Sequence, residues 1–153
     1  FNLDGGKTLT VFGVHFPSAA SPHVKRALAM EYLNSLAANS RSSIVIAGGD
    51  FNSISTEDSR LYRKMGYDTW FVSHLEACRN CLGTNYYSRA DSWSFLDALL
   101  LTKTSSAKMD YASVTVVNDL ALQTNNDGTP RSFDTKTSKG VSDHFAVFAL
   151  FTY

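Results

Sequence analysis

The sequence has no excess of charge of either sign. Its 14 lysines and arginines balance its 14 aspartates and glutamates, so the formal net charge at pH 7 is zero. A chain without net positive charge has no overall field that steers it toward nucleic acid or an anionic membrane. This balance weakens a nucleic-acid function without excluding it, because a local groove can be basic on a neutral chain.

Long hydrophobic runs are also missing. No stretch approaches the roughly 18 apolar residues that a membrane helix needs, and none has the pattern of a signal peptide. The sequence therefore predicts no membrane span. Because the chain begins at Phe1 without an initiator methionine, we expect the natural N-terminus and any targeting segment to lie outside these 153 residues.

Cysteine is scarce, with only Cys78 and Cys81 in the stretch CRNC. One CxxC without a second pair is a weak zinc signal, and a redox CxxC is expected to open a helix after a strand, which this one does not. Two interpretations stay open, a local disulfide that pins a loop or two free thiols. A disulfide would favour an extracellular or periplasmic location; otherwise the location is unknown.

What the sequence does contain is typical of one α/β domain. The 153 residues are 44% hydrophobic, enough for one ordinary core, and we find no internal repeat, low-complexity segment or domain boundary. Residues 8–16 are rich in β-branched and aromatic side chains and predict a strand. Ser21-Pro22 predicts the start of a helix that runs to about Asn39, with a buried stripe at Ala29, Leu33, Leu36 and Ala37.

The rest of the chain predicts one more helix and several strands. A strand over residues 42–47 is expected to end at Gly48-Gly49, and the next helix to begin near Ser55 or Thr56, with Glu57 and Asp58 in its first turn and Gly66 beyond its end. Further strands are predicted near TNYY and over residues 95–101, 112–117 and 145–153, the last as a central strand. Residues 118–140 form a long polar loop, which is usually functional or mobile.

Polar side chains collect where these strands begin or end: His15, Asp50 with Asn52, Asp97, and Asp143 with His144. Loops at strand ends are where α/β proteins build their sites. Taken singly, each of these residues is more typical of a turn, a cap or a half-buried histidine than of catalysis. Their joint occurrence predicts one site at one edge of the sheet.

Asp97 interrupts an apolar strand, so it must either be exposed or find a charged or hydrogen-bonding partner. His144, at the mouth of the last strand, is the natural partner for its carboxylate. That pairing would leave the other ring nitrogen of His144 to take a proton from water. Asp97 would then orient the histidine and not act as a nucleophile.

The GDFN stretch supplies the second element of the predicted site. Asp50 and Asn52 lie two residues apart and can point to the same side. A carboxylate beside an amide suits a hard cation such as Mg²⁺ and a phosphate oxygen. The lack of suitable thiolates argues against structural zinc.

Together these motifs are similar to a known family. VHFPS at 14–18, GGDFNS at 48–53, WSFLDALLL at 93–101 and VSDHFAV at 141–147 resemble, in order and spacing, the second half of the endonuclease/exonuclease/phosphatase superfamily with its pancreatic deoxyribonuclease-like fold. The resemblance implies half of a four-layer α/β/β/α sandwich, with a mixed, mostly antiparallel sheet and helices on one face. It also implies Mg²⁺-dependent phosphate-ester hydrolysis, with Mn²⁺ or Ca²⁺ as alternatives.

The resemblance implies a role for each site residue. His144 would be the general base, and Asp97 would orient it. Asn52 would hold the phosphate, and His15 would donate to the phosphate or to the leaving group. Asp50 would position the water or the metal, and Asp143 would lie at the metal.

One departure from the family is large: no stretch corresponds to the glutamate in its first half that is the principal metal ligand. We therefore expect residues 1–153 to be the C-terminal half of a domain whose N-terminal half is absent. The absent N-terminal half is expected to be a partner of residues 1–153. Half a sandwich would expose a large sheet face. Alone, the fragment is expected to bind Mg²⁺ weakly and to hydrolyse phosphodiesters poorly or not at all.

Three functions follow from these observations. The first is a metal-dependent nuclease that cleaves nucleic-acid phosphodiesters by a histidine-activated water. The second keeps the chemistry for a phospholipid or a small phosphorylated molecule, in the manner of sphingomyelinases and inositol phosphatases. The third is a non-catalytic scaffold, against which the intact set of six polar residues argues.

Overall fold

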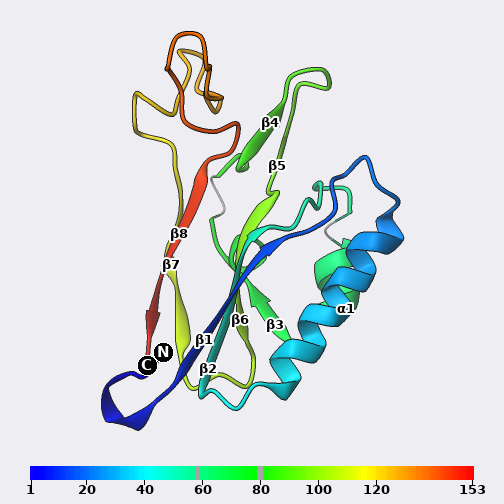
Figure 1. Ribbon diagram of the computed structural model, residues 1–153, viewed down its shortest axis with the longest axis vertical. Helices are drawn as coiled ribbons and strands as arrows, with labels where there is room; N and C mark the ends of the chain where they lie inside the picture. Colours follow the sequence, from blue (N-terminus) through cyan, green and yellow to red (C-terminus); the bar gives the residue numbers. More distant parts are fainter. Residues whose placement is uncertain (58, 79–80) are drawn as a thin grey trace.

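A mixed four-stranded sheet lies at the centre of the computed structural model, which describes residues 1–57, 59–78 and 81–153 (Figure 1). The strands stand in the order β1 (Leu9–His15), β2 (Ile44–Asp50), β6 (Asp97–Thr102) and β3 (Trp70–Val72). β1 and β2 are parallel, and both β2 and β3 are antiparallel to β6. The mixed sheet agrees with the predicted fold class.

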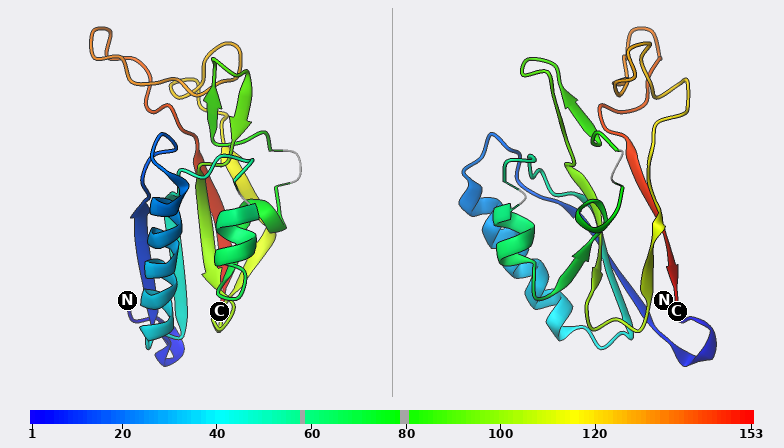
Figure 2. Two further views of the ribbon diagram at one scale, coloured as in Figure 1. Left: turned by 90° about the vertical axis from the view of Figure 1, so that its right-hand side faces the viewer. Right: turned by 180° about the vertical axis from the view of Figure 1, so that it is seen from behind.

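Helix α1 (His23–Asn39) connects β1 to β2 and covers one face of the sheet (Figures 1 and 2). Parallel neighbours need such a crossover, because a tight turn cannot join them. Met30 and Leu33 of the helix pack on Ala47 and Leu100 of the sheet. The predicted buried stripe of this helix was only partly correct. Leu33 and Ala37 are buried as predicted, whereas Leu36 is only partly buried. Met30 and Arg26, which were not predicted, are buried as well.

The hairpin of β7 (Lys108–Val117) and β8 (Ala146–Thr152) lies on the other side of the sheet (Figure 1). A second core joins Ile44 and Leu101 to Met109 of β7. The prediction of a central strand at 145–153 was wrong for the described residues, where β8 pairs with β7 alone. Its apolar run alternates in burial, so that Phe148 and Leu150 stay 46% and 52% exposed.

The second predicted helix is present as a π-helix, η2 (Ser59–Met65), and Asp58 lies outside the described residues. The Gly66 N–H donates to the Leu61 carbonyl at 3.1 Å, five residues back. The remaining short elements are η1 (Asp4–Gly6), α2 (Ser73–Glu76), β4 (Asn85–Tyr87) and β5 (Ser92–Ser94). Residues 118–140 form the predicted long loop, crossed only by isolated bridges in the described chain.

Gly49 is part of β2, so the strand does not end at Gly48-Gly49 as predicted but continues to Asp50. Its φ is +140°, and a Cβ there would collide with the carbonyl oxygen of Val14 on β1. The glycine therefore permits close approach of two strands and does not make a turn. As a consequence, Asp50 is the last residue of β2 and lies beside His15.

A disulfide joins Cys78 and Cys81, which decides between the two interpretations of the cysteine pair. Arg79 and Asn80 between them lie outside the described residues. Within the described chain, no helix has the length and apolar character needed to cross a membrane.

Candidate active site

The sheet aligns three of the predicted site residues in one row. His15 on β1 is in register with Asp50 on β2, and Asp50 is in register with Asp97 on β6. Residues directly opposite each other on neighbouring strands share a face of the sheet. His15 Nε2 lies 3.5 Å from Asp50 Oδ2, with the His15 side chain 78% exposed and the Asp50 side chain 21% exposed.

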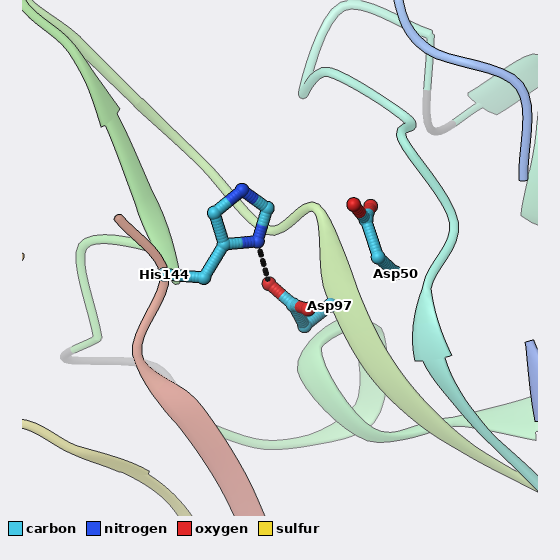
Figure 3. Close-up of side chains that lie close together, drawn as sticks. All are labelled: Asp50, Asp97 and His144. Atoms are coloured by element: carbon cyan, nitrogen blue, oxygen red, sulfur yellow. Dashed lines mark hydrogen bonds and ion pairs between the residues drawn. The ribbon is translucent and has the colours of Figure 1, made fainter. Parts of the chain in front are cut away.

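His144 joins this row through Asp97, as Figure 3 shows. Its Nδ1 lies 2.8 Å from Asp97 Oδ2, and both side chains are about four-fifths shielded from solvent. The two residues are 47 positions apart in the chain. The partner of the carboxylate in the apolar strand is therefore the histidine that precedes β8, as predicted.

The electrostatics of the site act mainly on His144 and Asp50. The hydrogen bond to Asp97 raises the pKa of His144 above its ordinary value; burial opposes the rise without cancelling it. Burial raises the pKa of Asp50, and the negative charge of Asp97 raises it further, against the hydrogen bond from the Asn52 backbone N–H. The site thus holds crowded negative charge beside a histidine that gains proton affinity.

Two neighbouring residues that the sequence did not single out, Thr84 and Asn85, hold Asp97 and His144 in place. The Asp97 backbone N–H donates to Thr84 Oγ1 at 3.1 Å, and the Phe145 N–H donates to the Thr84 carbonyl at 2.8 Å. Asn85 forms a bridge with His144. Thr84 is fully buried, and the polar Thr-Asn step after Gly83 was the only signal of this role.

Asn52 is turned inward, toward Asp50. Its backbone N–H donates to Asp50 Oδ1 at 2.7 Å, and its side-chain Nδ2 donates to Asp50 Oδ2 at 3.1 Å and to the Phe16 carbonyl at 3.0 Å. It adopts a positive φ of 50°, which Asn tolerates better than most residues. Here Asn52 orients Asp50, and its predicted phosphate-binding role stays a prediction.

Asp143 is exposed beside His144, and its backbone carbonyl accepts a hydrogen bond from Asn85 Nδ2 at 3.1 Å. Its charge adds to the rise in the pKa of His144. Its predicted place at a metal stays a prediction, because the cluster of possible metal ligands in the described chain has other members.

That cluster consists of Asp50, Asp97 and His144, which each offer one ligand atom within 4.8 Å of the other two. Two of the three members offer carboxylate oxygens as donors. Hard divalent cations prefer such oxygens. The raised pKa of Asp50 is consistent with a cation site, since a cation would offset the repulsion between Asp50 and Asp97.

Asp97 and His144 face a pocket of about 280 Å³. Asp97 and His144 form part of its wall, and Gln123 of the long loop and Val141 just after that loop form another part. The long loop therefore contributes to the surroundings of the site.

Comparisons with known proteins show likeness in structure only: no protein-family model matches the chain, and no curated protein does. A mannosyl-6-phosphatase, Bt3783, of Bacteroides thetaiotaomicron VPI-5482 matches with a TM-score of 0.60 and 19% identity, over 98% of this chain and 53% of its own. TDP2 of D. rerio, in complex with a single-strand DNA product, matches with a TM-score of 0.67 and 14% identity, over 97% and 58%.

An endonuclease/exonuclease/phosphatase family protein of Bacteroides thetaiotaomicron matches with a TM-score of 0.54 and 19% identity, over 95% of this chain and 51% of its own. The chain thus spans between one half and three fifths of the length of these structures. These likenesses confirm the predicted fold class, a mixed α/β fold of the endonuclease/exonuclease/phosphatase type.

Proposed function

We propose that this chain carries the hydrolytic centre of a metal-dependent phosphoesterase. The observation that carries the proposal is the 2.8 Å contact between His144 Nδ1 and Asp97 Oδ2, with Asp50 in the adjacent strand. A histidine whose ring is oriented by a largely shielded carboxylate is an arrangement suited to general-base catalysis. The shared fold with phosphatases supports this class of chemistry.

In the proposed reaction His144 Nε2 accepts a proton from water while the water oxygen forms a bond to phosphorus. The P–O bond to the leaving group breaks, and the leaving oxygen takes up a proton. Asp97 fixes the tautomer of His144 by accepting from Nδ1–H, and its charge stabilises the imidazolium that forms. Asp97 is therefore a positioning residue.

The other residues of the row bind or orient. His15, exposed at the end of β1, is proposed to donate to the phosphate or the leaving oxygen. Asp50, with Asp143 nearby, would hold the cation, and Asn52 would keep Asp50 in place and contact phosphate. A bound divalent ion such as Mg²⁺ would neutralise negative charge on the phosphoryl oxygens.

We propose nucleic-acid phosphodiesters as the leading substrate class. The solved TDP2 structure of the same fold holds a single-strand DNA product, which supports this choice. A small phosphorylated molecule is the second candidate, supported by the mannosyl-6-phosphatase with the same fold. Plasmid DNA, RNA, sphingomyelin and inositol phosphates, assayed side by side, would separate these classes.

We also propose that these residues form one half of a larger domain. The exposure of Phe148 and Leu150 on β8 and of Val11 on β1 supports this, because apolar strand faces are usually covered. The Cys78–Cys81 disulfide supports an oxidising compartment, extracellular or periplasmic.

The decisive test of function is His144→Ala in the full-length natural protein, assayed on bis(p-nitrophenyl) phosphate with Mg²⁺. Loss of the general base is expected to lower kcat by about 10²–10⁴-fold. His23→Ala is the matched control, since His23 begins α1 and lies outside the row of site residues. Equal rates for His144→Ala and the control would contradict the mechanism and favour a scaffold role.

A further inference from the structure

A second, larger pocket lies beside the candidate active site and is not used by the proposed mechanism. Its volume is about 650 Å³, which lies within the usual range of small-molecule sites. Leu96, in its wall, directly precedes Asp97, and Ile54 follows Asn52 by two residues. The pocket therefore adjoins the same strand ends that carry the catalytic groups.

Hydrogen bonds hold the walls of this pocket together. Arg26, which is 1% exposed, donates to the carbonyls of Ser18 and Ser21 on either side of the Ala19-Ala20 wall. The same guanidinium pairs with Glu57 at 2.5 Å, next to the wall formed by residues 54–56. The buried guanidinium of Arg26 thus links the Ala19-Ala20 wall to the wall formed by residues 54–56. This link indicates that the cavity is preformed.

The third wall is the β4–β5 hairpin, which Figure 1 shows standing above the end of the sheet. The Ser55 N–H lies 3.4 Å from Ser94 Oγ, and Ser55 Oγ donates to the Trp93 carbonyl at 3.4 Å. The Trp93 ring is packed against buried Phe145, with centroids 6.1 Å apart. Asn85 of this hairpin bridges to His144, so the same hairpin bounds the pocket and supports the catalytic histidine.

The chemistry of the lining restricts what can bind. The described residues that line the pocket include no charged side chain; they are apolar, aromatic, hydroxyl or amide groups. A second phosphate would meet no positively charged side chain there, whereas an uncharged ring would contact the apolar side chains of Ile54 and Leu96. Tyr87 also lines the pocket, and because the residue is 54% exposed its ring offers a face for stacking. Serine hydroxyls in the same lining suit polar atoms at a ring edge, which an alkyl chain lacks.

We infer that this pocket is a subsite for a planar ring of the substrate next to the scissile phosphate, either a nucleobase joined through its sugar or an aryl group joined through the ester oxygen. The inference rests on the proposed function and narrows it to a substrate class. The phosphate would lie at the row of His15, Asp50 and Asp97, with the ring behind Leu96 and Ile54.

The test measures binding of inorganic phosphate, butyl phosphate, phenyl phosphate and adenosine 5′-monophosphate in the presence of Mg²⁺. Ring-bearing phosphates are expected to bind at least about tenfold more tightly than inorganic or butyl phosphate, as burial of one apolar group allows. Tighter binding of adenosine monophosphate assigns a base; tighter binding of phenyl phosphate assigns an aryl ester. Equal affinity for butyl and phenyl phosphate would overturn the planar-ring assignment.

Substitutions in the pocket lining test whether the ring binds there. Ile54→Asn and Tyr87→Ala are expected to lower the ratio of phenyl phosphate to inorganic phosphate affinity by about fivefold or more. Leu28→Asn and Tyr32→Ala, at exposed positions of α1 outside the pocket, are the matched controls. An unchanged ratio in both pocket variants would overturn the inference.

Adenosine and phenol, which lack phosphate, separate this inference from the proposed function. If they perturb NMR signals of Ile54 and Leu96 while no phosphoester is hydrolysed, binding of a planar ring by the pocket stands and the phosphoesterase proposal fails. If phosphoesters are hydrolysed but the ring has no effect on affinity, the phosphoesterase stands and the subsite fails.

Discussion

At the scale of single residues, the pair of Asp97 and His144 determines when the proposed base is active. The hydrogen bond favours protonated His144 and so raises its pKa. A general base must be neutral, so activity is expected to rise with pH as His144 loses its proton, above its ordinary value of 6.5.

Asp97→Asn is expected to lower the pKa of His144, because the acceptor loses its charge. The rising limb of the pH–rate profile should move to lower pH while the maximal rate falls. NMR titration of the metal-free chain gives the pKa directly, and Asp143→Asn, which removes a weaker influence, should shift it less. A His144 pKa that stays in place in Asp97→Asn would contradict the assigned cause.

The same pair makes stability depend on pH, with a definite sign. A histidine whose pKa is raised by folding contributes stability that is fully present below its unfolded value of about 6.5 and lost as pH rises through the folded value. The difference in unfolding free energy between the natural chain and Asp97→Asn should therefore be larger at pH 6 than at pH 9. A difference that grows with pH would be the opposite of this expectation.

At the scale of elements, the spacing of β1 and β2 depends on Gly49. Gly49→Ala combines an unfavourable positive φ with a clash against the Val14 carbonyl, and is expected to destabilise the chain by roughly 1–3 kcal/mol or more. Gly13→Ala on β1 is the matched control, because a Cβ there meets nothing within 4 Å. Urea unfolding of both variants measures the effect, and equal losses would argue against the close approach of the strands.

Arg26 links α1 to two loops next to the site. Arg26→Met removes its bonds to Ser18, Ser21 and Glu57 and leaves the Glu57 carboxylate without this partner. A loss of about 2–4 kcal/mol is expected, because several charge-assisted hydrogen bonds to one buried group disappear together. Lys25→Met, at an exposed neighbour, should change thermal stability little; equal losses in the two variants would show that Arg26 is not a buried anchor.

At the scale of the whole molecule, the chain matches about half of each similar structure, and β8 leaves apolar side chains exposed. We expect the 153-residue chain to bind Mg²⁺ weakly and to turn over bis(p-nitrophenyl) phosphate poorly beside a longer natural chain that contains it. Metal binding by calorimetry and turnover by absorbance check this. Equal turnover by both chains would show that no further segment is needed.

Local patterns in the sequence were enough to predict the main elements and the contact between Asp97 and His144. The strand around residues 8–16, the helix that ends at Asn39 and the isolated carboxylate at Asp97 follow from periodicity and from the cost of burying a charge. These features depend on residues that are close together in the sequence, so they can be predicted from the sequence alone. The pairing of Asp97 with His144 followed because a buried carboxylate needs a partner.

Tertiary structure decided what depends on contacts between distant segments. The register that aligns His15 with Asp50, the close approach at Gly49 and the support of Asp97 by Thr84 are set by how strands meet, and no local pattern specifies that distance. Burial of Arg26 likewise depends on two loops that fold around it. The sequence by itself determined which groups are available for chemistry, and packing determined which of them meet.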